Sequence, residues 1–265
     1  MRTALLAALA ASAALPAASA DPLYEEGFSM RLGGFQSSAD TTLRLDASSG
    51  SLGTTISLED DLGFTKNKTL PVIDAIWRIT PRHRIELGYT RLARDAQKTL
   101  TGEIRFGDSV FQLNTSVNSN FDSDVWRLTY GWSLYREGGN ELSLLLGLHT
   151  TSFKVGMSKV GGSVQIAEAA DATVPLPTIG LSGTWAIDPQ WRLGAAAQFF
   201  SLNYGDYDGS LFNGSISAEY RLNRNFALGA GYTVYDYNLD ATKNKFRGSF
   251  DYKFAGPMLY VTGGF

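Results

Sequence analysis

The chain has 265 residues, of which 44% are hydrophobic, 12% aromatic and only 18% charged, and it contains no cysteine. A mean hydropathy of −0.09 excludes a protein with several membrane-spanning helices, because each span needs about 20 consecutive apolar residues. Without cysteine there is no thiol catalysis, cysteine-ligated metal or disulfide, and the formal net charge of −3 excludes a basic nucleic-acid-binding surface.

Residues 1–20 have the features of a cleaved secretory signal peptide. Arg2 supplies a positive charge, residues 4–16 form a run of apolar and small side chains, and Ala18-Ser19-Ala20 matches an A-x-A cleavage site. We therefore predict an exported mature chain, residues 21–265, that forms one domain.

After residue 20 the side chains alternate with a period of two, which is typical of β-strands. Between residues 125 and 135, large apolar side chains such as Trp126 and Leu128 alternate with small or polar ones. Residues 142–149 and 213–221 repeat this pattern. The mature chain is therefore predicted to be all-β.

Aromatic residues on the apolar face distinguish a membrane barrel from a soluble sandwich. A transmembrane β-barrel carries girdles of aromatic residues at the two membrane interfaces and a polar interior. Five aromatic residues lie close to short turns and form the predicted girdle: Trp77, Tyr89, Trp132, Trp185 and Trp191.

Turn lengths alternate along the chain. Short turns at residues 80–82, 137–140, 188–190 and 223–225 separate longer polar stretches at about 46–69, 106–121, 160–172, 205–209 and 240–245. Short periplasmic turns and long extracellular loops are typical of outer-membrane barrels. The sequence favours an antiparallel up-and-down barrel of ten strands, at about 27–45, 69–80, 83–103, 122–136, 141–159, 173–187, 191–204, 210–222, 225–239 and 246–265.

The first of these strands is irregular. Phe28, Met30 and Leu32 occupy even positions, whereas Leu43 and Leu45 occupy odd ones, so we expect a β-bulge near residues 37–38. Two other strand counts stay open: an extra hairpin at residues 39–58 would give twelve strands, and merging weak segments would give eight.

These features together resemble the small bacterial outer-membrane β-barrel proteins, the broad group around the OmpA, OmpX and OmpW barrels. The resemblance rests on the Ala18-Ser19-Ala20 signal, the alternating strands and the final run of residues 258–265. It implies that Phe265 is the signal read by the barrel-assembly machinery, although Pro257 and Gly263 depart from the usual pattern. It also implies an outer-membrane location, with membrane lipids and lipopolysaccharide as partners.

Charged residues on the polar face are predicted to line the lumen: Arg31, Asp74, Arg78, Glu86, Arg127, Arg192, Glu219, Arg221, Asp251 and Lys253. Arg78 and Glu86 flank the turn at residues 80–82, so we expect them to form an ion pair across two adjacent strands. Two interpretations stay open: the charges neutralise one another and fill a narrow barrel, or they form an Arg-lined selectivity constriction.

The chain has two histidines. His83 lies in a short turn and is expected to be hydrated. His149 is expected to face the lumen, at a level where outer-membrane lipid-modifying enzymes and phospholipases carry a catalytic histidine. Its nearest hydroxyls are predicted to be Thr151 and Thr129, and a neighbouring Arg127 disfavours the imidazolium form that a general base must adopt. A structural role is therefore favoured, with His149 kept as a candidate.

Acidic residues gather in the predicted loops: Glu59, Asp60, Asp61, Asp122, Asp124, Asp206 and Asp208. Such groups bind Ca²⁺ or Mg²⁺ when the spacing is right, but no dedicated calcium motif is present, so a hydrated surface is favoured. No metal or cofactor is predicted. Residues 57–63 also fit a short capped helical turn.

The primary hypothesis is a non-enzymatic outer-membrane barrel with a structural or surface-interaction role and a charge-filled lumen. The alternatives are a narrow channel for small solutes and an outer-membrane lipid hydrolase that uses His149.

Overall fold

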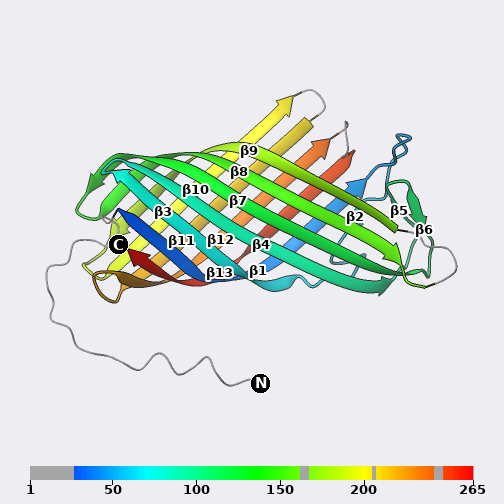
Figure 1. Cartoon of the computed structure of the whole chain (residues 1–265), viewed down its shortest axis with the longest axis horizontal. Coiled ribbons are helices and arrows are strands. Elements are labelled where there is room, and N and C mark those ends of the chain that lie inside the picture. The colour runs from blue at the N-terminus through cyan, green and yellow to red at the C-terminus, as the bar shows by residue number, and fades with distance from the viewer. Residues whose placement is uncertain (1–26, 162–166, 205–206, 242–246, 265) are drawn as a thin grey trace, which may run out of the picture.

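The protein forms one closed antiparallel β-barrel in the computed structural model, which describes residues 27–161, 167–204, 207–241 and 247–264 (Figure 1). The signal peptide predicted at residues 1–20 and the assembly signal predicted at Phe265 lie outside this range. Within the described residues no helix is long and apolar enough to cross a membrane. The barrel strands are β1 (Phe28–Leu45), β3 (Asn67–Thr80), β4 (His83–Thr99), β7 (Ser116–Glu137), β8 (Asn140–Lys159), β9 (Ala167–Ala186), β10 (Trp191–Tyr204), β11 (Tyr207–Arg221), β12 (Phe226–Ala241) and β13 (Gly248–Gly264).

Each barrel strand pairs with its neighbour in the chain, and β13 pairs with β1 to close the ring. The ten-stranded barrel that the sequence favours is therefore confirmed, and the eight- and twelve-stranded alternatives are wrong. Three short elements lie outside the ring: β2 (Ile56–Ser57), which extends the edge of β1, and the hairpin of β5 (Ile104–Phe106) and β6 (Ser109–Phe111).

The two ends of the barrel differ. At one end, called the turn end here, the tight connections 81–82, 138–139, 187–190 and 222–225 join the strands. Gly138 and Gly139 have φ angles of 57° and 82°, which a two-residue hairpin turn of this kind requires. The opposite end, called the loop end, carries the long connections, including residues 46–66 and the β5–β6 hairpin.

A band of large apolar side chains covers the outer face toward the turn end. On β8, for example, Leu142, Leu146 and Leu148 are exposed, whereas the next outward residues are Thr150, Ser152 and Lys154. Trp77, Trp132, Trp185 and Trp191 are exposed near the turns. Tyr89 contacts the exposed Trp126 higher on the wall, with ring centroids 4.5 Å apart. Arg91 and Asp124 follow directly above this aromatic pair, which marks the upper edge of the apolar band.

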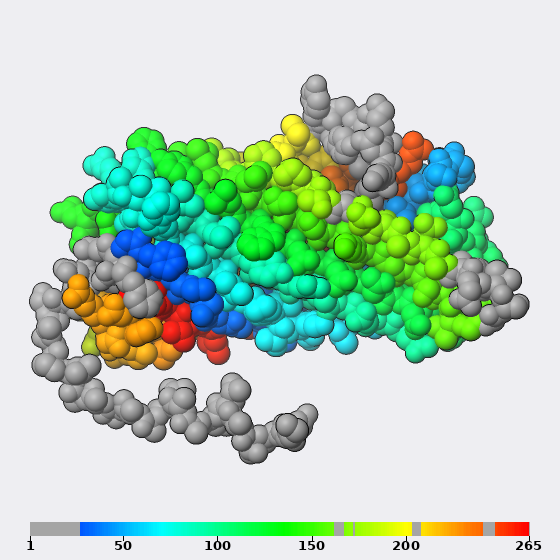
Figure 2. All heavy atoms as spheres, viewed as in Figure 1, coloured from blue at the N-terminus to red at the C-terminus, as the bar shows by residue number. Residues whose placement is uncertain are grey.

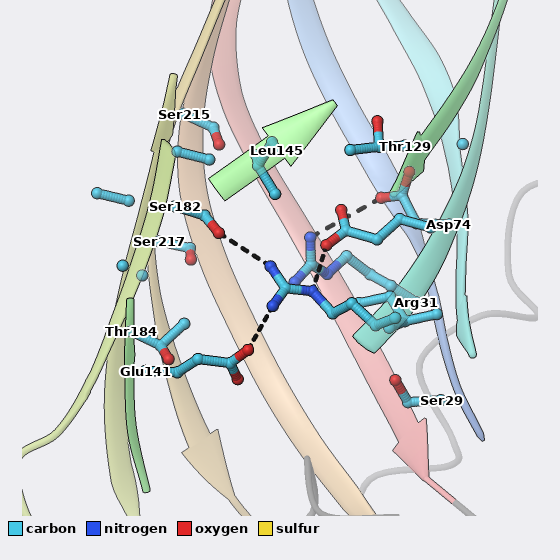
Figure 3. A pocket seen from close by; sticks show the side chains of 18 of the residues that line it. Ser29, Arg31, Asp74, Thr129, Glu141, Leu145, Ser182, Thr184, Ser215 and Ser217 are labelled. Carbon is cyan, nitrogen blue, oxygen red and sulfur yellow. Dashed lines mark hydrogen bonds and ion pairs between the residues drawn. The ribbon is translucent and has the colours of Figure 1, made fainter. Parts of the chain in front are cut away.

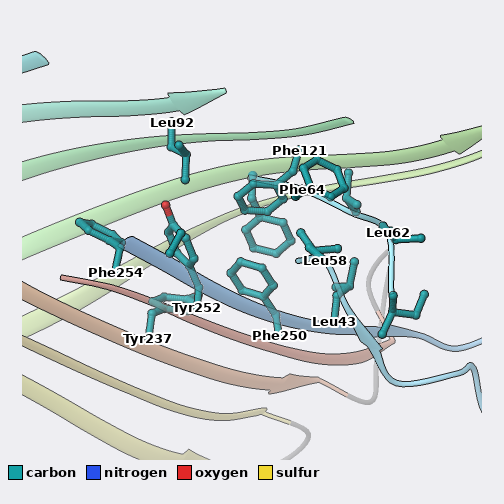
Figure 4. Packing of buried hydrophobic residues seen from close by; sticks show 14 of the residues in the cluster. Leu43, Leu58, Leu62, Phe64, Leu92, Phe121, Tyr237, Phe250, Tyr252 and Phe254 are labelled. Carbon is teal, nitrogen blue, oxygen red and sulfur yellow. The ribbon is translucent and has the colours of Figure 1, made fainter. Parts of the chain in front are cut away.

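Above that edge, apolar side chains fill the interior instead of the outer face. Phe250, Tyr252, Phe121 and Phe153 pack there with Leu43 in a core resembling that of a soluble protein (Figure 4). This change from an apolar outer face to an apolar interior explains the irregular pattern of β1. Its apolar residues near the turn end point outward, and those near the loop end point inward. The pairing of β1 with β13 and β3 runs without a register shift, so the bulge predicted near Ser37-Ser38 is wrong.

The same change corrects two predicted lumen residues. Asp251 and Lys253 lie on the exposed outer face of β13, because Phe250, Tyr252 and Phe254 take the interior positions. This part of the strand extends beyond the apolar band, where charged side chains can stay hydrated outside the barrel.

Two loop segments complete the wall at the loop end. β3 pairs with β4 only from Ile73 to Thr80, so the upper part of β4 needs another neighbour. Residues 56–65 lie against it and direct Ile56, Leu58 and Phe64 into the core (Figure 4). The β5–β6 hairpin adds the buried Phe106 and Phe111. Figure 2 shows the side chains of β4, β7 and β8 packed into a continuous outer wall.

Candidate functional site: a charged cavity in the barrel interior

A polar cavity of about 210 Å³ occupies the barrel interior toward the turn end (Figure 3). Its lining combines charged side chains with hydroxyl and amide groups, including Ser182, Thr184, Ser217 and Asn213. Leu145 and Gln198 are buried residues of this lining, and Gln198 contacts His149, whose ring stacks on Tyr235 of the aromatic core. The site is therefore a compartment enclosed by the barrel wall.

Glu141 is the centre of one charge network. It accepts hydrogen bonds from Arg84 and, at 2.9 Å, from Arg78, and its side chain is 6% exposed. Arg84 also donates to Glu86 at 2.6 Å and to Ser182 at 2.9 Å, so one guanidinium joins three strands (Figure 3). A charge buried in this way is stabilised only when its hydrogen-bonding groups are satisfied.

A second network crosses the barrel. Arg127 donates to Asp74 at 2.9 Å, and Arg31 lies 3.8 Å from the same carboxylate. Arg31 then donates to Glu219 at 3.2 Å and stacks over the ring of Tyr260, 4.3 Å from its centroid. These interactions connect β7, β3, β1 and β11 through the interior.

Glycines on the wall make room for the guanidinium groups. A Cβ atom on Gly88 would lie 2.6 Å from Asp74 Oδ1 and 2.7 Å from Arg127 Nη2. A Cβ atom on Gly131 would lie 3.0 Å from the Arg84 side chain. Small residues at these inward positions are therefore part of how the sequence encodes the networks.

Seven of the ten predicted lumen residues line the cavity: Arg31, Asp74, Arg78, Glu86, Arg127, Arg192 and Glu219. Arg192 donates to Thr184 at 2.7 Å. Arg221 is half-buried at the end of β11 and is not part of the lining, and Asp251 and Lys253 lie outside the barrel, as described above.

The predicted Arg78–Glu86 ion pair is wrong. A register irregularity between Arg78 and Thr80 places Arg78 opposite Arg84, so Arg78 reaches Glu141 and Glu86 binds Arg84. Arg84 and Glu141 were not among the predicted lumen residues. Strand alternation contained the signal for them, since Arg84 shares its face with Glu86, and Glu141 shares its face with Ser143.

His149 lies above the cavity, fully buried, opposite Arg127 on the neighbouring strand as predicted. Its Nε2 is 3.2 Å from Gln198 Oε1, and its ring stacks on Tyr235 with centroids 6.2 Å apart. The hydroxyl of Thr151 is 3.2 Å from that of Tyr235. The group facing His149 is thus a side-chain amide, which is not a nucleophile.

Asp206, one of the predicted acidic loop residues, lies outside the described residues. His83 and the other acidic loop residues are exposed or half-buried, with one exception. His83 is 2.6 Å from the Tyr130 hydroxyl at the exposed turn end, and Asp124 accepts from Tyr89 at 2.6 Å on the outer face. Glu59 departs from the predicted hydrated surface, because its side chain is 1% exposed and paired with Arg94. No cluster of three metal-binding side chains occurs in the part of the chain that the structure describes.

The predicted capped turn in the first loop is present. Asp61 N donates to Ser57 O at 2.9 Å, and the Ser57 hydroxyl accepts from Asp60 N at 3.1 Å. This turn positions Glu59 toward the barrel interior.

A closed antiparallel barrel with an apolar outer band and a polar compartment inside it defines the class: the fold is that of a small bacterial outer-membrane β-barrel. Among solved structures, the chain is similar to the outer membrane protease OmpT from Escherichia coli, with 11% identity, coverage of 90% of this chain and 96% of that chain, and a TM-score of 0.61. At this identity the likeness concerns the fold alone.

Two further barrels align over most of their length with lower TM-scores. The attachment invasion locus protein Ail of Yersinia pestis has 13% identity, covers 91% of this chain and 99% of that chain, and has a TM-score of 0.37. The translocator domain of the autotransporter NalP from Neisseria meningitidis has 12% identity, coverage of 90% and 89%, and a TM-score of 0.42. No protein-family model matches the chain, and no curated protein sequence matches it.

Proposed function

We propose that the protein is an integral outer-membrane barrel with a closed interior and a non-enzymatic role, which holds a rigid loop end at the cell surface. The observation that carries this proposal is the packed core of the loop half. Side chains from the wall, from residues 56–65 and from the β5–β6 hairpin meet there and leave the interior apolar and filled.

The charged networks support the same proposal from the turn end. Guanidinium and carboxylate groups are joined across the cavity from β1 to β9, as expected of side chains that fill and brace a narrow barrel. Membrane lipids and lipopolysaccharide are the partners of the apolar band, and the barrel-assembly machinery acts before the final structure forms.

A narrow channel for small solutes is the second candidate, and the cavity itself favours it. Five arginines and four acidic residues line this cavity of about 210 Å³. Conduction would require the aromatic core of the loop half to open, since Phe121, Tyr235 and Phe250 are each at most 1% exposed. The hydrolase candidate has less support, because the partner of His149 is the Gln198 amide.

Surface labelling of intact cells tests the proposal. A short epitope inserted at Gly102, whose Cβ direction is open, should be detected by antibody without permeabilisation, and the protein should fractionate with the outer membrane. An epitope inserted in the 223–225 turn is the matched control and should require permeabilisation. An inner-membrane or soluble fraction, or the reversed labelling pattern, would contradict the proposal.

A further inference from the structure

β9 and β10 separate halfway along the barrel wall. They pair only from Ala186–Arg192 to Ile179–Phe199, although β9 continues to Ala167 and β10 to Tyr204. Each keeps its other neighbour along that length, since β9 pairs with β8 as far as Ala167 and β10 pairs with β11 as far as Tyr204. Figure 1 shows the ends of β10 and β11, in yellow, leaving the line of β9.

The sequence of β9 encodes this separation. Pro175 and Pro177 lie opposite Thr150 and Leu148, and the ladder with β8 runs past both without a shift. In an antiparallel strand, successive residues direct their N–H groups alternately toward one neighbouring strand and the other. The two prolines have no N–H group, and because the ladder with β8 is unbroken, the missing donors are those that would have faced β10. Proline is confined to strand edges for this reason.

Gly180 marks the point where the strands diverge. A Cβ atom there would lie 2.1 Å from the carbonyl oxygen of Ala197, so β9 and β10 are in unusually close contact at this level. One residue further on, Ile179 and Phe199 form the last pair. The wall thus changes within a short distance from tight pairing to two unpaired edges, called the seam here.

The seam begins at the upper rim of the apolar band. Ile179 and Phe199 are outward-facing and exposed, while the next outward residues, Pro177 and Ser201, are proline and polar. Along the inner side of the seam lie Val174, Leu176, Phe200 and Leu202. Leu202 shares the inward face of Gln198 and Phe200 yet is 48% exposed, because no part of β9 is paired beside it.

We propose that the seam is a lateral docking site for an acyl chain of a membrane lipid, which lies between β9 and β10 against Phe200 and Leu202. Three observations select this occupant. The seam continues upward from the lipid-facing band, its inner lining is apolar, and an added peptide strand would find no donors at Pro175 and Pro177. The inference goes beyond the proposed function and depends only on its membrane location.

Photo-crosslinking in vesicles tests the seam. The protein is reconstituted in phosphatidylcholine vesicles that contain a phosphatidylcholine with a diazirine in its acyl chain, illuminated, and mapped by mass spectrometry. We expect crosslinks at Leu193 and Leu228 of the outer face and also at the inward-facing Phe200 and Leu202. Absence of crosslinks at both inward positions would overturn the inference. Absence at the outer positions as well would instead reject the membrane location.

A disulfide across the seam provides the matched variant. Extending the β9–β10 register makes Pro177 and Ser201 the next outward partners, and the chain has no other cysteine to interfere. Oxidised P177C/S201C should lose the crosslinks at Phe200 and Leu202 and regain them on reduction. The control L181C/A197C joins residues that are already paired and should keep these crosslinks. Unchanged crosslinking in oxidised P177C/S201C would contradict lateral entry.

Discussion

Glu59 and Arg94 form an ion pair in which each side chain is 1% exposed. Glu59 also accepts a hydrogen bond from Thr41 N at 2.9 Å, and Arg94 donates to the Thr41 hydroxyl at 2.8 Å. Glu59 of the first loop is thereby bonded to both β1 and β4. It lies where β3 no longer pairs with β4. The Glu59–Arg94 pair therefore holds residues 56–65 in the barrel wall beside the aromatic core.

Replacing Glu59 by alanine should destabilise the protein by about 3–5 kcal/mol, because Arg94 would remain buried without a carboxylate. The double variant E59A/R94A should be destabilised less than E59A, since it leaves no buried charge. Unfolding midpoints in detergent, followed by the heat-dependent shift in gel mobility, measure the difference. Asp60, which is exposed in the same turn, is the control, and D60A should unfold like the wild type. Equal losses in E59A and D60A would show that the pair is not structurally important.

Glu141 should matter more for stability than Glu86. Glu141 accepts from Arg78, Arg84 and Ser143 and is 6% exposed, whereas Glu86 is 30% exposed and binds Arg84. We expect E141A to lower the free energy of unfolding by several kcal/mol and E86A by about 1 kcal/mol. Denaturant titration in micelles compares them, and a larger effect of E86A would contradict the arrangement of this network.

Two glycine substitutions should differ in severity. An alanine at Gly180 would meet the backbone of Ala197, which cannot move independently, and should cost about 1–3 kcal/mol or prevent folding. An alanine at Gly88 meets the ends of the flexible Asp74 and Arg127 side chains and should cost less. G102A has no atom within 4 Å of its Cβ and serves as the neutral control. A reversed order in the unfolding midpoints would contradict the close approach of β9 and β10.

Removal of Phe265 should impair assembly while leaving export intact, since export is predicted to depend on residues 1–20 and assembly on Phe265. The amount of heat-modifiable barrel in the outer membrane should fall, and unassembled protein should accumulate in the periplasm. A full-length chain with V110A, altered in the loop-end hairpin, should assemble normally. Wild-type levels of the truncated barrel would refute the role assigned to Phe265.

The sequence predicted the barrel because strand alternation and turn length are local features that do not depend on distant contacts. The ten strands and the inward position of His149 followed from that alternation. The errors arose where the environment changes along a strand. On β13 the apolar residues Leu259 and Val261 point outward near the turn end, whereas Phe250 and Tyr252 point inward at the loop end, so hydrophobicity alone reversed the assignment of Asp251 and Lys253.

Contacts between distant segments were beyond sequence reasoning for a different reason. Arg78 and Glu141 are 63 residues apart, and their meeting depends on a register irregularity beside the first turn. The pairing of Glu59 with Arg94 depends on how far β3 extends, which no local pattern encodes. Pro175 and Pro177 were visible in the sequence, but their meaning required the register of β9 against both neighbours.

Single-channel recording in planar bilayers tests the closed interior most directly. The refolded mature protein should insert without producing stepwise conductance, because the aromatic core and residues 56–65 close the loop half. E59A, which releases that segment from β1 and β4, should produce intermittent openings, whereas D60A should stay silent. Stable conductance steps from the wild-type protein would contradict the closed barrel and establish the channel in its place.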